Sequence, residues 1–155
     1  MEIIEYSSNY AKAVTDLFYS SVHAIDSSAY SEEQINVWAP FPIDYVAWDR
    51  RLELKRPYLL LINEQLAGFI ELESDGHIDC AYVSPKFQRN GVATSLLKYV
   101  IGRAKKLELK SLYVEASIVA KPLFEKMGFV VKNENRLIRN KIVLYNYSMH
   151  LELKP

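Results

Sequence analysis

The sequence predicts a mixed α/β fold, of the α+β kind, in which helices flank a central β-sheet. An apolar segment of strand character, residues 78–83, leads through a short turn into an amphipathic segment, residues 92–104. Another strand-like segment, Leu109–Glu115, follows that predicted helix. Because it comes after a strand and a crossover helix, it should run parallel to the strand at His77–Val83.

Length and composition favour one globular domain, residues 1–155, with 50% hydrophobic residues to build its core. Nineteen basic and nineteen acidic side chains cancel, so the excess positive charge typical of nucleic-acid binders is absent from the sequence. No apolar run is long enough to span a bilayer, and Cys80 is the only cysteine. We therefore expect a soluble, cytoplasmic protein that binds neither nucleic acid nor membrane.

The N-terminal part predicts a short strand and two helices. Glu2–Tyr6 reads as the strand, and Ser7-Ser8-Asn9 begins a helix. The apolar face of this helix consists of Val14, Leu17, Phe18 and Val22. Ser31 and Gln34 have the spacing of a capping box, which opens the next helix; Pro40 ends it.

Asp44 is placed to cap a third helix. Its periodicity predicts one set of side chains facing inward, namely Tyr45, Trp48 and Leu52. It predicts a basic set facing outward, namely Arg50, Arg51, Lys55 and Arg56. The region His23–Trp48 is rich in aromatic residues, which suits either core packing or the wall of a pocket.

The remaining chain predicts a strand meander and two further strands. Tyr58–Ile62 and Leu66–Glu73 form a hairpin, and the turn 74–76 leads to His77–Val83. After Leu109–Glu115, Ser117 can cap a helix that ends at Gly128. A strand should start at 129–131 and another should span 142–153, with residues 133–141 as the loop between them.

The turn between the apolar strand and the long helix is suited to binding phosphate. The first amides of a helix have no partner inside the helix and lie at the positive end of its dipole. Gly91 lacks a Cβ, so a ligand can approach the backbone closely, and Ala93 and Thr94 keep the first turn uncrowded. A diphosphate fits such a helix start.

The pattern Gln88-x-x-Gly91-x-Ala93 after a strand resembles the acetyl-CoA signature of the GCN5-related N-acetyltransferase (GNAT) family. The stretch from Ala116 to Phe129 is similar to the second motif of that family, and Tyr147-Ser148-Met149-x-Leu151 is similar to its usual final strand. Val22-His23-x-x-Asp26 and Trp38-Ala39-Pro40 resemble a bacterial subgroup of unassigned acetyltransferases. The resemblance covers essentially the whole chain.

This resemblance implies a GNAT-type acyl-CoA N-acyltransferase fold, a mixed sheet whose parallel central strands splay apart, with acetyl-CoA in the gap. Its diphosphate would lie on the amides from about Gln88 to Thr94, and its pantetheine along the backbone of the preceding strand. The cofactor-binding residues carried over are Ala81, Tyr82, Val83, Gln88, Arg89, Asn90, Gly91, Val92, Ala93, Thr94, Ser117 and Phe124.

The chain departs from the family pattern at two positions. Ser117 stands where the family usually has Asn. Phe124 stands where many members have a tyrosine that protonates the departing thiolate, and phenylalanine has no proton to give. Water or another residue then takes that role, or the chemistry is slow. Phe124 also favours an alternative in which the protein holds acyl-CoA as a sensor without turnover.

Acetyl transfer to an amine requires a neutral nucleophile, stabilisation of the oxyanion and a route for one proton. Backbone amides near Ala81–Val83 are candidates for the oxyanion. His77 and Asp79 share a face of their strand, and we take them as the candidate catalytic pair, with neutral His77 as base and Asp79 orienting it or acting through water. Structural roles for both side chains stay open, and Tyr82 and Tyr113 are alternative proton donors.

Tyr30, Trp38 and Trp48 are the candidate acceptor-binding residues, since aromatic faces attract cations and flat apolar groups. We expect acetyl-CoA-dependent transfer to the primary amine of a small molecule, with a protein or peptide amine as the alternative acceptor. Three scattered histidines predict no metal site. A homodimer is compatible with the sequence.

Overall fold

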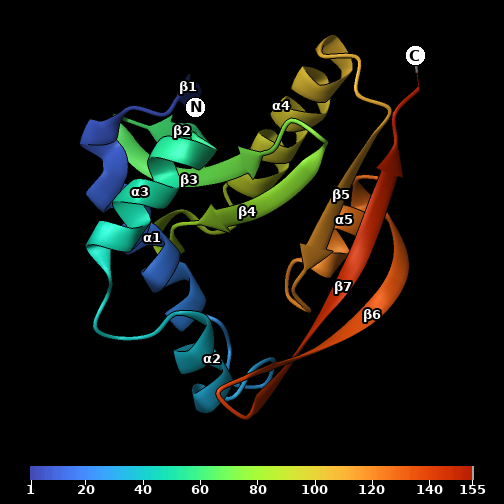
Figure 1. Cartoon of the computed structure of the whole chain (residues 1–155). Helices are drawn as coiled ribbons and strands as arrows, with labels where there is room; N and C mark the ends of the chain where they lie inside the picture. Colours follow the sequence, from blue (N-terminus) through green and yellow to red (C-terminus); the bar gives the residue numbers. More distant parts are fainter. Residues whose placement is uncertain (155) are drawn as a thin grey trace.

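A seven-stranded mixed sheet with helices on both faces forms the protein, whose computed structural model describes residues 1–154 (Figure 1). The strand order is β1-β2-β3-β4-β5-β7-β6, and among the described strands only the central pair β4 and β5 runs parallel. The strands are β1 (Glu2–Glu5), β2 (Tyr58–Ile62), β3 (Gln65–Leu72), β4 (His77–Val83), β5 (Ser111–Ala116), β6 (Val130–Arg139) and β7 (Ile142–Glu152). The predicted mixed α/β architecture and the parallel pair are confirmed.

The helices are α1 (Ala11–His23), α2 (Glu32–Trp38), α3 (Tyr45–Lys55), α4 (Val92–Lys106) and α5 (Lys121–Lys126). Short 3₁₀ turns, η1 (Ser8–Tyr10) and η2 (Pro85–Phe87), precede α1 and α4. Within residues 1–154, no helix has both the length and the apolar character needed to cross a membrane.

Local capping explains where these helices begin. Ser31 and Gln34 form the predicted capping box of α2, and the Asp44 carboxylate accepts the Ala47 amide at the start of α3. Ser117 caps less directly than expected: its hydroxyl accepts the Ala120 amide, in the turn that precedes α5. Gly91, at φ 73°, precedes α4.

Two apolar layers cover the sheet because its strands alternate their side chains between the faces. On one face, Ile70 and Ile78 pack with Leu96 and Val100 of α4. On the other face, Phe69 packs with residues of α1 and α3. Helices α1, α2 and α3 therefore lie on the face opposite to α4 (Figure 1).

The parallel strands splay apart. Strands β4 and β5 pair only through His77 with Tyr113 and Ile78 with Val114, after which they diverge. A bulge begins at the same level, because Ile70 pairs with Ala81 whereas Leu72 pairs with Ile78. Residues 79–80 of β4 therefore stand opposite Glu71 alone, which bends β4 away from β5. The splayed central pair expected from the family resemblance is confirmed.

Three local predictions are wrong. Residues 133–141 are no loop, because most of them extend β6, which pairs with β7 up to Arg139 opposite Ile142. Tyr45 is exposed and hydrogen-bonds Asp16 instead of facing the core. Arg51 and Lys55 turn inward to carboxylates on the sheet, which periodicity along one helix could not show.

Candidate active site

A cavity of about 490 Å³ lies on the α1–α3 side of the splayed strands. Its lining side chains come from β4 to β7, from α1 and α3, and from the α2 region. They are Phe18, Tyr30, Trp38, Trp48, Arg51, Asp79, Cys80, Tyr82, Glu115, Ser117, Asn135, Leu137, Arg139, Leu144, Tyr145 and Asn146. The three predicted acceptor-binding aromatics and Asp79 are among them, whereas His77 is not.

The floor of the cavity is an ion-pair cluster built on the bulge. Nη2 of Arg51 lies 2.6 Å from Oε1 of the fully buried Glu71 and 3.0 Å from Oδ2 of Asp79. Nζ of Lys55 lies 2.8 Å from the same Asp79 oxygen. Desolvation opposes ionisation of Asp79, but Lys55 and Arg51 outweigh it and lower the pKa of this carboxyl. Asp79 is thus held as a paired carboxylate.

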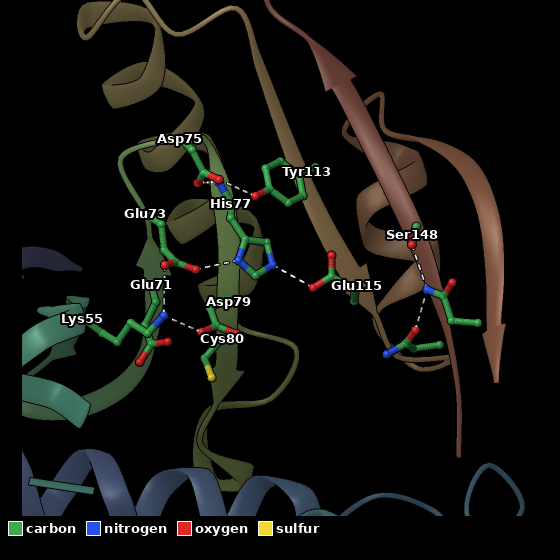
Figure 2. Close-up of polar contacts among 12 residues, drawn as sticks. Lys55, Glu71, Glu73, Asp75, His77, Asp79, Cys80, Tyr113, Glu115 and Ser148 are labelled. Carbon is green, nitrogen blue, oxygen red and sulfur yellow. Dashed lines mark hydrogen bonds and ion pairs between the residues drawn. The ribbon is translucent and has the colours of Figure 1, made fainter. Parts of the chain in front are cut away.

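His77 is clamped between two carboxylates (Figure 2). Its Nδ1 lies 2.6 Å from Oε1 of Glu73, and its Nε2 lies 2.7 Å from Oε1 of Glu115 on β5. The ring also stacks on Tyr113, with centroids 4.7 Å apart. Desolvation of the ring opposes its charge, yet the bonds to Glu73 and Glu115 outweigh this and raise the pKa of His77. Both nitrogens are therefore engaged, so the structure offers no free lone pair on this ring.

Aromatic side chains form another part of the cavity wall. Nε1 of Trp38 donates to the Tyr82 hydroxyl over 3.1 Å. Trp48 lies against Phe18, with ring centroids 4.6 Å apart, and the Arg51 guanidinium lies 5.4 Å from the centre of the Trp48 ring. This wall combines apolar faces with a fixed cation.

The Tyr30 hydroxyl joins three segments around the cavity. It accepts the Ile118 amide over 2.9 Å and donates to the Tyr145 carbonyl over 3.3 Å. Its ring meets Trp38 edge-on, with centroids 5.3 Å apart. Tyr30 therefore ties the loop before α2 to the end of β5 and to β7.

The Gly91 turn has the backbone of an anion site. Arg89 (φ 65°) and Gly91 (φ 73°) are left-handed, and no atom lies within 4 Å of a Cβ built on Gly91 among the described residues. The Ser95 amide makes the first bond of α4, to the Gly91 carbonyl, so the amides of residues 92–94 point out of the helix start. The turn can therefore present backbone donors to a diphosphate.

One edge of β4 is open toward the gap. The Ser84 amide donates to Ala67 of β3, so alternation along an antiparallel pair directs the amides of Ala81 and Val83 to the other edge. Nε2 of Gln88 donates to the Val83 carbonyl on this edge, over 3.4 Å. The open edge thus runs from the bulge to the Gly91 turn.

Ser117 and Phe124 lie beyond the end of β5. The Ser117 side chain lines the cavity. Phe124 is only 3% exposed and meets Phe129 edge-on, with centroids 5.1 Å apart. It belongs to the core between the sheet and α4, so its contribution is apolar.

Two groups of side chains lie close enough together to be compared with metal sites; each combines two carboxylates with a thiol or an imidazole. Glu71, Asp79 and Cys80 form one, and Glu73, His77 and Asp79 form the other; in each, the ligand atoms lie within 4.8 Å of one another. Arg51 and Lys55 already neutralise these carboxylates. We therefore read both groups as ion-pair clusters.

Comparison with known proteins assigns the family. The model of the Acetyltransferase (GNAT) domain matches residues 26–151. This chain belongs to the GNAT family of acetyltransferases. An uncharacterized N-acetyltransferase of Escherichia coli (strain K12), YafP, is 34% identical over 137 residues, which is 88% of this chain and 86% of YafP.

Solved structures of GNAT proteins share the fold. A GCN5-related N-acetyltransferase from Rhodopseudomonas palustris matches with a TM-score of 0.91 and 28% identity, covering 98% of this chain and 95% of that one. YncA, a putative acetyltransferase from Salmonella typhimurium solved with its cofactor acetyl-CoA, matches with a TM-score of 0.74 and 18% identity, covering 100% and 95%.

Sequence reasoning missed several residues of this GNAT site. Arg51 was expected on the solvent side, and Glu115 was given no role. Asn135 lines the cavity and donates to Asn146, over 2.9 Å, and to Ser148, over 2.8 Å. Asn135 was missed because residues 133–141 were expected to form a loop. The strand β6, which contains Asn135, is too polar to be recognised from alternation alone.

Proposed function

We propose that the protein transfers the acetyl group of acetyl-CoA directly to the primary amine of a small molecule. The observation that carries this proposal is the cavity of about 490 Å³, whose walls are aromatic and whose lining includes the carboxylates of Asp79 and Glu115. Its volume lies in the range of sites that enclose small ligands. Aromatic faces and carboxylates both favour a cationic amine.

Acetyl-CoA would bind on the other side of the gap. Residues 88–94 would hold its diphosphate, and the open edge of β4 would pair with its pantetheine. The amides of Ala81 and Val83 then point at the thioester and can stabilise the oxyanion that forms when the amine attacks. The nitrogen–carbon bond forms, the carbon–sulfur bond breaks, and one proton leaves the nitrogen.

The acceptor favoured by this cavity has a flat apolar body attached to its amine. Trp38, Trp48 and Tyr82 offer ring faces or edges to such a body, and Tyr30, which also lines the cavity, meets Trp38 edge-on. A protein or peptide amine is better served by a shallow groove. We include a cytoplasmic location in the proposal, in keeping with the single free cysteine, Cys80.

The test is a panel of amines incubated with acetyl-CoA, with thiol release followed by absorbance and products identified by mass spectrometry. The panel compares 2-phenylethylamine with ethylamine and with a short peptide carrying a free N terminus. We expect kcat/KM to be highest for 2-phenylethylamine. Preference for the peptide would favour the alternative acceptor, and tight acetyl-CoA binding without turnover on any amine would favour a sensor.

A further inference from the structure

Asp79 and Glu115, the two carboxylates that line the cavity, differ in their ion-pair partners. Asp79 receives both Arg51 and Lys55 on one oxygen. Glu115 is bound only through Oε1, by His77, among the described residues, and its side chain is 43% exposed. The second oxygen of Glu115 is therefore available to a ligand in the cavity. Asp79 also keeps one oxygen outside these contacts among the described residues, but two permanent cations already share its charge, whereas Glu115 is bound by a single imidazole.

Glu115 also stands at the apex of the gap. It follows Val114, the last residue of β5 that pairs with β4. On β4, Ala81 lies beyond the bulge, roughly two strand steps, or about 7 Å, past the corresponding level. An amine nitrogen between the Glu115 carboxylate and a thioester on the Ala81 edge would contact both. Figure 2 shows the Glu115 side chain reaching from β5 toward β4.

His77 fixes Glu115 in this position. Its ring is held from behind by Glu73, whose other oxygen lies 3.1 Å from Lys55, and from the side by the stacked Tyr113. A ring anchored in this way, with its Nε2 2.7 Å from Oε1 of Glu115, leaves the Glu115 carboxylate little freedom. The same contacts occupy the ring nitrogens that a base at His77 would need.

We propose that Glu115 is the catalytic residue that takes the proton from the acceptor nitrogen, and that His77 is a positioning residue acting through it. This inference rests on the proposed acetyl transfer. As the nitrogen attacks the thioester carbon, one N–H proton passes to the free oxygen of Glu115. The coenzyme A thiolate departs and takes a proton from water, and Glu115 releases its proton to solvent through its exposed side.

Glu115→Ala and Glu115→Gln provide the test, with 2-phenylethylamine as the acceptor. Loss of a general base should lower kcat by roughly 10²–10⁴-fold in both variants. Added formate should restore turnover in Glu115→Ala, because the truncated side chain leaves room for a small carboxylate, and should not restore it in Glu115→Gln, where the amide fills that room. Glu134→Gln, the same charge change at an exposed position of β6, is the control.

His77→Gln should lower kcat by a smaller factor, with acetyl-CoA affinity unchanged by calorimetry. Combined with Glu115→Gln, it should cause no further loss, because a residue that acts through Glu115 has nothing left to position. Three outcomes would overturn this inference while leaving the proposed function intact. They are additive losses in the double variant, wild-type kcat in either Glu115 variant, and failure of formate to restore turnover in Glu115→Ala. Absence of turnover by the wild type on every amine would overturn the proposed function itself.

Discussion

The indole N–H of Trp38 donates to the hydroxyl of Tyr82, which joins the end of α2 to β4 in the wall of the cavity. The Tyr82 ring lies between Phe18 and Phe69, with centroids 5.0 and 5.8 Å away. Desolvation, with nearby negative charge, raises the pKa of Tyr82, so its hydroxyl keeps its proton. The wall is therefore a fixed aromatic surface that depends on Trp38.

Replacing Trp38 with alanine should weaken acceptor binding. Loss of the aromatic face should lower kcat/KM for 2-phenylethylamine by about tenfold, equivalent to about 1.4 kcal/mol. Trp38→Phe, which keeps a ring but lacks the N–H donor, should lose less. Leu52→Ala, at a fully buried position, should cost about 2–5 kcal/mol of stability with normal kinetics in the folded enzyme. The same outcome for Trp38→Ala would make Trp38 a core residue only.

A negative charge at the Gly91 turn should weaken cofactor binding. Asn and Asp both tolerate the left-handed backbone at this position, and a side chain has open space there, so both variants should fold. Gly91→Asp should bind acetyl-CoA at least about tenfold more weakly than Gly91→Asn, because its carboxylate repels the diphosphate. Calorimetry measures this, and equal affinities would contradict the diphosphate assignment.

Turnover should not require a hydroxyl at position 124. Phe124→Tyr should fold, losing at most about 1–3 kcal/mol if the new hydroxyl finds no partner in the core around Phe129. Its kcat should equal or exceed that of the wild type, because a tyrosine here supplies the acid that many family members use. Stopped-flow thiol release gives kcat. A large loss of kcat with unchanged acetyl-CoA affinity would show that position 124 does not face the thiol.

The clamp around His77 should make stability depend on pH. Because the folded pKa of His77 is raised, its ion pairs stabilise the fold fully below the unfolded value of about 6.5, and this stabilisation is lost as pH rises through the folded pKa. The difference in unfolding free energy between wild type and His77→Gln should therefore shrink toward alkaline pH. Denaturant titrations across that range test it, and a constant difference would argue against a protonated ring.

Removing Arg51 should leave the buried Glu71 carboxylate without its counter-ion. Glu71 is fully buried and burial raises its pKa, so Arg51→Met should cost about 3–5 kcal/mol near neutral pH. Glu71→Gln in the same chain should recover part of this loss. The deficit of Arg51→Met should also shrink as falling pH protonates Glu71. Urea unfolding at several pH values measures it, and a pH-independent deficit would mean that Glu71 is already neutral.

Much of the architecture follows from local sequence. The residues that begin the helices depend on neighbours only a few positions away. Ser31 caps α2 with Gln34, Asp44 accepts the Ala47 amide, and Gly91 directly precedes α4. Apolar periodicity identified the strands that pack on α4, because burial on one face leaves a direct pattern. The start of β6 was predicted, but its continuation through residues 133–139 was missed, because pairing with β7, and not an apolar face, holds that part in place.

The sequence by itself determined the family, the helix and strand order, and the turn at Gly91, because each depends on contiguous residues. Only the tertiary structure decided which charges meet. Arg51 reaches Glu71 over 20 positions, and His77 reaches Glu115 over 38, through a bulge and a splay that no local pattern encodes. Ion pairing acts through space, so the histidine that the sequence suggests as a free base is bound by two carboxylates in the fold, which raise its pKa.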